Sequence, residues 1–272
     1  ANHGIHPDEM TLAEVVKQKG YATACFGKWH LGHHPKFLPT NHGFDEYFGL
    51  PYSNDMWPFH PTAGSRFPDL PLMEGTRVID PQVTAEDQEH LTTWYTEHAV
   101  DFICRNKDRP FLLYVPHSMA HVPLFVSDKF KGKSKRGLYG DVMMEIDWSV
   151  GQILSSLERL GLDRRTLVIF SSDNGPHMES HNDPLRFNPS GPLRGMKRDL
   201  YEGGIRVPLI AWWPGMIRPG QVSGYVGYFG DLMATVCELA RVDTPPNTDS
   251  ISFLPTLLGQ PDSQKEHEYL YW

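Results

Sequence analysis

Cysteine is scarce in this sequence of 272 residues, which contains only Cys25, Cys104 and Cys237. Three scattered cysteines are too few to form a disulfide framework. None belongs to a Cys-x-x-Cys pair, so a zinc site built from thiolates is not expected either. We interpret all three as buried or half-buried thiols.

Long hydrophobic runs and excess positive charge are also absent. No stretch of about 18 apolar residues occurs, so we predict no membrane span. The formal net charge of -8 argues against nucleic acid as a partner, because binding to phosphates needs a basic face. With 40% hydrophobic and 21% charged residues, the chain has the composition of an ordinary folded domain.

The first residues lack an initiator methionine, a basic segment and an apolar segment, so they carry no readable targeting signal. The last residues, 268–272, resemble the beginning of a strand rather than the end of a domain. Both ends look cut, and we therefore expect the chain to be a piece of a longer protein.

Turn formers and apolar periodicity predict that helices alternate with short strands. Thr11-Leu-Ala-Glu14 is a capping box and predicts a helix that ends at Gly20. Apolar runs and stripes predict the strands 21–26, 111–115, 167–170 and 206–213, and the helices 88–105, 138–157 and 231–240. Residues 35–87 are rich in proline, glycine and aromatics with little periodicity, which predicts a long structured excursion. The alternation predicts an α/β domain around a mainly parallel sheet.

Polar clusters follow three of the predicted strands, at the point where each strand ends. In chain order they are Lys28 with His30, His117 with His121, and Asp173 with Asn174. Parallel sheets bind ligands beyond the carboxyl ends of their strands. The repetition therefore predicts one common site at one edge of the sheet.

The most specific string in the chain is Gly27-Lys-Trp-His-Leu-Gly32, and three further blocks follow it. They are Gly43–Ser53, Ser172–Pro176 and Tyr201–Arg206. In this order the four blocks resemble the type I sulfatase family, and the resemblance extends over essentially the whole chain. The stretch Pro51-Tyr-Ser53 is most similar to the arylsulfatase A branch.

The resemblance implies an alkaline-phosphatase-like α/β fold, with a mostly parallel central sheet flanked by helices and truncated at both ends. Residues 1–272 would be a partial sulfatase catalytic domain that lacks the N-terminal nucleophile segment and a C-terminal subdomain. The implied activity is the hydrolysis of sulfate monoesters, on an aryl sulfate or a sulfated carbohydrate, by a formylglycine and calcium mechanism.

A sulfate monoester must be held by positive charge, attacked at sulfur and relieved of its leaving group. By resemblance, Lys28 and His30 would contact the sulfate and the nucleophile, and His30 would help to release sulfate. His121 and Lys197 would bind the sulfate and assist departure of the leaving group. Ser53 matches a serine that contacts substrate in the arylsulfatase A branch.

Asp173 and Asn174 offer hard oxygen ligands of the kind that Ca²⁺ or Mg²⁺ prefers. In the family they coordinate a divalent cation, usually Ca²⁺, but calcium needs roughly six to eight oxygens. The remaining ligands would come from an N-terminal aspartate pair and from the formylglycine, which is made from Cys or Ser in a C/S-x-P/A-x-R sequence. We expect both to precede Ala1.

Each assignment has a rival within the chain. His117 competes with His121, and Arg194 and Arg198 compete with Lys197. Ser190–Arg194 fits the serine form of the modification sequence but lies too far downstream, and Cys237–Arg241 has Leu where Pro or Ala is needed, so we reject both. The cluster His30, His33 and His34 suggests zinc but has no evident further ligand. Without the four blocks, these residues would be ordinary strand ends, turn formers and solvated charges.

The expected partners are a sulfated small molecule or glycan and the enzyme that generates the formylglycine. By resemblance we expect an exported location, which is periplasmic, secreted or lysosomal. Two alternatives stay open: a phosphonate or phosphodiester hydrolase of the same superfamily, and a non-catalytic, carbohydrate-binding relative. We predict that the 272 residues alone are inactive, because the nucleophile and part of the metal site are expected outside them.

Overall fold

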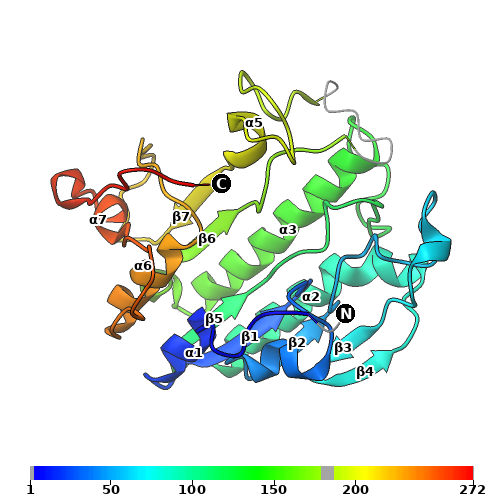
Figure 1. Cartoon of the computed structure of the whole chain (residues 1–272), viewed down its shortest axis with the longest axis horizontal. Coiled ribbons are helices and arrows are strands. Elements are labelled where there is room, and N and C mark those ends of the chain that lie inside the picture. The colour runs from blue at the N-terminus through cyan, green and yellow to red at the C-terminus, as the bar shows by residue number, and fades with distance from the viewer. Residues whose placement is uncertain (1–2, 179–186, 272) are drawn as a thin grey trace. The chain divides into compact units, whose positions relative to one another are not determined.

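The computed structural model describes residues 3–178 and 187–271. These fall into two compact units (Figure 1). Unit 1 comprises Ala1–Leu160 with Ala240–Pro245, and unit 2 comprises Gly161–Leu239 with Pro246–Trp272.

Unit 1 is built on a five-stranded sheet with the order β4-β3-β2-β1-β5. Its strands are β1 (Ala22–Phe26), β2 (Glu46–Gly49), β3 (Leu72–Glu74), β4 (Arg77–Asp80) and β5 (Phe111–Tyr114). Strand β1 is central and pairs in parallel with both β2 and β5. Strands β3 and β4 form an antiparallel hairpin that extends the sheet beyond β2.

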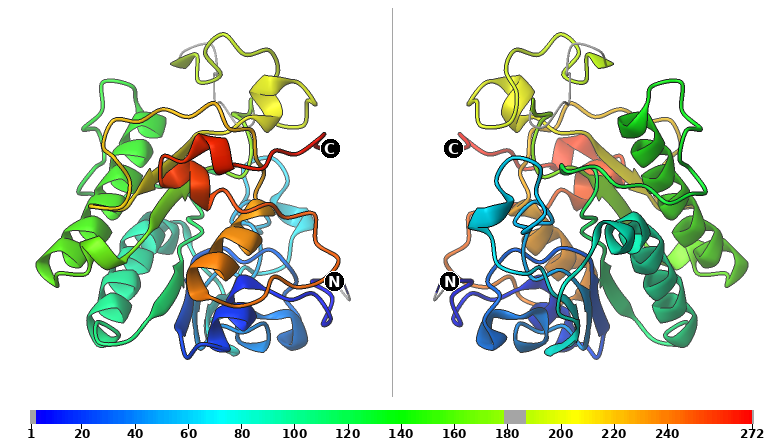
Figure 2. Two further views of the ribbon diagram at one scale, coloured as in Figure 1. Left: turned by 90° about the vertical axis from the view of Figure 1, so that its left-hand side faces the viewer. Right: turned by 90° about the vertical axis from the view of Figure 1, so that its right-hand side faces the viewer.

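Helices cover both faces of this sheet (Figure 2). They are α1 (Leu12–Lys17), α2 (Ala85–Arg105) and α3 (Leu138–Arg159), with the short 3-10 helices η1 (Pro35–Phe37), η2 (Pro39–Asn41) and η3 (Gly64–Arg66). Phe26 and Phe48 pack on one face against Leu91 and Phe102 of α2, and α3 lies beside α2. On the other face Cys25 packs in a cluster with α1. All residues of β1 are buried, which explains its continuously apolar sequence.

Unit 2 contains a two-stranded antiparallel sheet of β6 (Val168–Ser171) and β7 (Leu209–Trp212). Its helices are η4 (Asp163–Arg165), α5 (Glu202–Ile205), α6 (Asp231–Ala240, whose last residue belongs to unit 1), α7 (Leu254–Leu257) and η5 (Pro261–Ser263).

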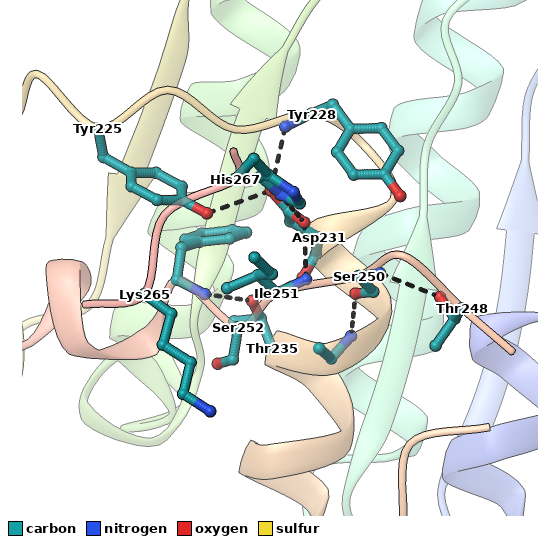
Figure 3. A network of polar contacts seen from close by, with 12 residues as sticks. Tyr225, Tyr228, Asp231, Thr235, Thr248, Ser250, Ile251, Ser252, Lys265 and His267 are labelled. Carbon is teal, nitrogen blue, oxygen red and sulfur yellow. Dashed lines mark hydrogen bonds and ion pairs between the residues drawn. The ribbon is translucent and has the colours of Figure 1, made fainter. Parts of the chain in front are cut away.

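The fully buried carboxylate of Asp231, at the start of α6, bonds to three other segments of unit 2 (Figure 3). It accepts hydrogen bonds from the backbone N–H of Ile251 at 2.8 Å and of Tyr228 at 3.1 Å, and from the Tyr225 hydroxyl at 3.3 Å. His267 Nε2 lies 2.9 Å from its Oδ1. Burial and the Asp231 charge raise the pKa of Tyr225. These bonds fix segments that are distant in the sequence.

The predicted α/β organisation is confirmed, and the capping box of Thr11 and Glu14 is present at α1. The sheet of unit 1 is mixed rather than mainly parallel throughout. The predicted structured excursion 35–87 contains β2, which is parallel to β1, and also the antiparallel strands β3 and β4. These strands have three or four residues each, too short to produce a visible alternation. In the described part of the chain no helix has the length and apolarity needed to cross a bilayer.

Candidate functional site

The carboxyl ends of β1, β2 and β5 are joined by backbone hydrogen bonds that continue beyond the strands. The N–H of Lys28 donates to Pro116 O at 2.7 Å, after β5. The N–H of Gly27 donates to Phe48 O at 2.9 Å, and that of His30 donates to Pro51 O at 3.2 Å, after β2. The motif that follows β1 is therefore held between both of its neighbours, at the edge of the sheet where the sequence predicts a site.

Glycine is required where these strand ends meet. Gly27 has φ 146°, and a Cβ there would lie 2.0 Å from Pro116 O. A Cβ on Gly49, at φ 152°, would lie 1.9 Å from Gly27 O. Any side chain would force the three strand ends apart, so the first glycine of the motif is a packing requirement.

Trp29 orients the residues on either side of it. Its ring is 7% exposed, packs edge-on against Phe44 and donates its indole N–H to Phe37 O at 2.7 Å. With Trp29 anchored in the core, Lys28 is half-buried and His30 is exposed. His30 has φ 59°, a conformation that non-glycine residues seldom adopt and that is found preferentially at functional sites.

His121 lies in the connection that follows β5, against the segment that follows β2. Its Nδ1 lies 2.8 Å from Val122 O and 4.0 Å from Asp55 Oδ1. The neighbouring Asn54 is fully buried and donates to Pro123 O at 3.2 Å, which joins the two segments. His121 is 19% exposed and Asp55 is 30% exposed. The ring is thus held beside a carboxylate and remains partly accessible.

Two nearby buried groups differ in their surroundings. Ser53 is 2% exposed, and its hydroxyl has no hydrogen-bond partner among the described residues. His117 Nε2 lies 3.3 Å from the hydroxyl of Ser149 on α3. Burial lowers the pKa of His117 to about 4. His117 is therefore buried as a neutral ring against α3, whereas His121 remains partly accessible. This difference favours His121 over His117 as the ligand-binding histidine.

Unit 2 brings two of the four sequence blocks, Ser172–Pro176 and Tyr201–Arg206, together with the Lys197 segment. The N–H of Gly175 donates to Gly204 O at 2.9 Å, the N–H of Lys197 donates to Pro176 O at 2.7 Å, and the N–H of Gly203 donates to Arg194 O at 2.7 Å. A Cβ on Gly175 would lie 1.9 Å from Gly203 O, so this contact also requires glycine. The loop after β6 and the Lys197 segment are thereby packed against the start of α5.

Lys197 differs from its two basic neighbours. It is half-buried, whereas Arg194 and Arg198 are exposed. The Arg194 guanidinium lies 3.8 Å from the centre of the Tyr201 ring, a cation–π contact. Arg194 thus has a local structural role, and Lys197 is the better candidate of the three to hold an anion.

Asp173 and Asn174 follow β6 as predicted. Asp173 is exposed, and Asn174 donates its amide N–H to Gly175 O at 2.8 Å. That bond leaves the carbonyl oxygen of the Asn174 side chain for another contact, so the pair fits two positions of a cation site with oxygen ligands. Within residues 3–178 and 187–271, no three His, Cys, Asp or Glu residues form a metal-binding group.

The sequence-predicted residues are divided between the units. Lys28, His30, Ser53 and His121 lie at one edge of the sheet of unit 1, and Asp173, Asn174 and Lys197 lie in unit 2. Of the two rejected modification sequences, Cys237 is buried in α6, and Ser190 Oγ donates to Gly195 O at 3.4 Å.

Asp55 was missed by sequence reasoning. It lies two residues after Ser53 in a segment without periodicity, and only the packing against His121 distinguishes it from a surface acid. The sequence signal that could have found it is its adjacency to the Pro51–Ser53 stretch.

Comparisons with known proteins show which family this chain is similar to. A family model described as Sulfatase matches residues 1–242. N-acetylgalactosamine-6-sulfatase of Mus musculus is 40% identical over 265 residues, covering 94% of this chain and 50% of that protein. Arylsulfatase A of Bos taurus is 37% identical over 287 residues, covering 98% of this chain and 55% of that protein. The chain spans about half the length of the curated relatives it matches.

Among solved structures, the PsFucS1 sulfatase from Pseudoalteromonas sp. is similar with a TM-score of 0.84 and 28% sequence identity. The match covers 97% of this chain and 57% of that one. The predicted alkaline-phosphatase-like fold class is thereby confirmed.

Proposed function

Because this chain belongs to the sulfatase family, we propose that it is the central part of the catalytic domain of a sulfuric ester hydrolase. The reaction is the hydrolysis of sulfate monoesters. The observation that supports the proposal most directly is the hydrogen bond from Lys28 N–H to Pro116 O. It places the motif Gly27–Gly32 beside the start of the connection after β5 that contains His121.

In this proposal, the residues of unit 1 bind and orient the sulfate. The Lys28 ammonium neutralises charge on the sulfate oxygens, and His30 contacts the sulfate and the nucleophile. The buried hydroxyl of Ser53 supplies a hydrogen bond to the substrate. His121 donates a proton to the departing oxygen, and the Asp55 carboxylate stabilises the protonated ring. By the family resemblance, Lys197 would also bind the sulfate and assist departure of the leaving group.

Asp173 and Asn174 would hold a divalent cation, Ca²⁺ in the first instance, as two of its oxygen ligands. The cation would neutralise charge on the sulfate oxygens, and the formylglycine of the whole protein would supply the nucleophile. That residue requires a formylglycine-generating enzyme as a maturation partner. We propose an exported location for the whole protein, which is consistent with this maturation.

A sulfated carbohydrate is the proposed substrate class. The relatives include an N-acetylgalactosamine-6-sulfatase at 40% identity, which supports a sulfated sugar over a simple aryl sulfate. The cation-binding pair and the lysines serve any sulfate monoester, so they set the reaction type rather than the sugar.

The test is the turnover of nitrophenyl sulfate by the whole, matured protein and by its Lys28→Ala variant. Loss of a cation that stabilises developing charge should lower kcat/KM by about 10²–10³. Lys19→Ala, which removes an exposed lysine from the same unit, should change kcat/KM less than twofold.

Faster turnover of bis(nitrophenyl) phosphate than of nitrophenyl sulfate would favour the phosphodiester hydrolase instead. A whole protein that binds sulfated sugars but hydrolyses no sulfate would favour the non-catalytic relative. The 272 residues alone should turn over neither substrate.

A further inference from the structure

A buried asparagine lies between two residues of the candidate site. Asn54 stands between Ser53 and Asp55 in the segment that follows β2, and it is 0% exposed. Asparagine is seldom buried completely unless its amide is hydrogen-bonded. The position of Asn54 in the core therefore depends on the partners of its side chain.

The side chain of Asn54 connects three segments of unit 1. Its amide nitrogen donates to Pro123 O at 3.2 Å, in the connection after β5, and to Gln88 Oε1 at 3.2 Å. Gln88 lies near the start of α2 and is 1% exposed. Because a carbonyl oxygen can only accept, Pro123 O requires the NH₂ group of Asn54 to face it. The backbone of the connection after β5 thus fixes the orientation of this amide.

The connection after β5 is held on both sides of His121. On the N-terminal side, the N–H of His121 donates to Ser118 O at 3.2 Å, and the Ser118 hydroxyl lies 3.1 Å from the hydroxyl of Tyr95 on α2. On the C-terminal side, Pro123 O accepts from Asn54. Asn54 is therefore the anchor of the backbone directly after the His121 ring.

The buried pair of Asn54 and Gln88 is poorly satisfied. Among the described residues, neither Asn54 Oδ1 nor Gln88 Nε2 has a hydrogen-bond partner. A buried polar atom without a partner lowers stability, and two apolar side chains of similar shape would fill the same space at least as well. An apolar pair could not donate to Pro123 O. The contribution of Asn54 therefore lies in the position of the His121 connection rather than in stability.

The contact between His121 and Asp55 is sensitive to small shifts. His121 Nδ1 lies 4.0 Å from Asp55 Oδ1, at the outer limit of an ion pair. The bond from Asn54 to Pro123 O joins their two segments one residue from Asp55 and two residues from His121. A displacement of about 1 Å at a reacting group can lower a rate about 10²-fold. A change at Asn54 should therefore separate the pair without altering either side chain.

We propose that Asn54 is a positioning residue, which holds His121 and Asp55 in the arrangement that protonates the leaving oxygen. The proposal rests on the proposed sulfatase function, and Asn54 acts through its neighbours because it is itself fully buried. As the nucleophile bonds to sulfur, the bond between sulfur and the leaving oxygen breaks. Its electron pair stays on that oxygen, which takes the proton of His121. The more basic the leaving oxygen, the more the rate depends on the position of His121.

The test compares kcat of the whole, matured protein on an alkyl sulfate and on nitrophenyl sulfate. Leucine is close to asparagine in shape but makes no side-chain hydrogen bonds, so Asn54→Leu removes the donor without creating a cavity. It should lower kcat about tenfold on the alkyl sulfate and less than about threefold on nitrophenyl sulfate, whose leaving oxygen needs less protonation. The matched control Asn106→Leu replaces another buried asparagine, directly after α2, and should leave both values within about twofold.

A double variant separates positioning from stability. Asn54→Leu/Gln88→Met replaces both amides by apolar side chains of similar volume, so its urea unfolding midpoint should equal or exceed that of Asn54→Leu. The difference in kcat loss between the two substrates should persist, because Pro123 O still lacks its donor. The double variant also carries the test where the single variant does not fold. Asn54→Leu/Asp55→Asn should lose no more than about twofold beyond Asp55→Asn alone, since both changes act on one contact.

Equal losses on the two substrates, or no loss in Asn54→Leu, would overturn the proposal. Recovery of kcat together with the unfolding midpoint in Asn54→Leu/Gln88→Met would also overturn it. An unmodified protein without sulfate turnover would refute the sulfatase function, and a crystal structure of its Asn54→Leu variant would then decide the positioning role. An unchanged distance from His121 Nδ1 to Asp55 Oδ1 would overturn that role, and a pair that has moved apart would support it.

Discussion

Replacing the buried carboxylate of Asp231 by an amide should destabilise unit 2 strongly. Its Oδ1 accepts from Ile251 N–H at 2.8 Å and its Oδ2 accepts from Tyr228 N–H at 3.1 Å. In Asp231→Asn one of these oxygens becomes an NH₂ group, so one backbone N–H faces another donor whichever way the amide is turned. That N–H loses its acceptor at a cost of about 1–3 kcal/mol. The change also removes the charge beside His267, so we expect about 3–5 kcal/mol in total.

Urea unfolding followed by circular dichroism measures this loss. With a slope of about 1–3 kcal/mol per molar urea, the unfolding midpoint should fall by at least about 1 M. The matched control is Asp262→Asn in η5, where the carboxylate is exposed and the change should stay within about 0.5 kcal/mol. A loss below about 1 kcal/mol for Asp231→Asn would refute the reasoning, because the donors would then find acceptors without the second oxygen.

Gly27→Ala should destabilise unit 1 by at least about 1–3 kcal/mol in the same assay, because the new Cβ would overlap the carbonyl oxygen of Pro116. The control Gly151→Ala places its Cβ in open space within α3 and should stabilise unit 1 by up to about 1 kcal/mol. Equal effects of the two substitutions would contradict the packing argument. Burial lowers the pKa of His117 to about 4, so the unfolded chain takes up the proton first. The free energy of unfolding should therefore fall by up to about 3 kcal/mol as the pH drops from about 6.5 to 4, and His117→Gln should flatten this dependence. In the whole protein, Asp55→Asn should lower kcat about tenfold on alkyl sulfates. The loss should be smaller on nitrophenyl sulfate, because its leaving group needs less protonation. Equal losses on both substrates would show that Asp55 acts only on the structure.

The candidate residues come from short sequence motifs and from a family resemblance, and the structure shows which contacts hold some of them in place. Lys28 and His30 stand at fixed positions in a string whose glycine and tryptophan have no alternative in that packing. Asp173 and Asn174 follow directly after a strand, and Lys197 lies beside a glycine pair that packs against Gly175. In each case the motif marks the position, but the contacts that hold the backbone there, such as Lys28 N–H to Pro116 O and Lys197 N–H to Pro176 O, join separate segments.

The sequence by itself determined the α/β class, the capping box of α1 and the continuously apolar β1, because these depend on local periodicity and turn chemistry. The candidate site residues stay predictions that rest on motifs and on the family resemblance. The tertiary structure decided the rest. It added the hairpin of β3 and β4, brought Asp55 to His121 and bonded Gly132 and Ser134 to the buried carboxylate of Asp141. These features join separate elements, and their energies depend on which strand lies beside which, a choice that no local pattern specifies.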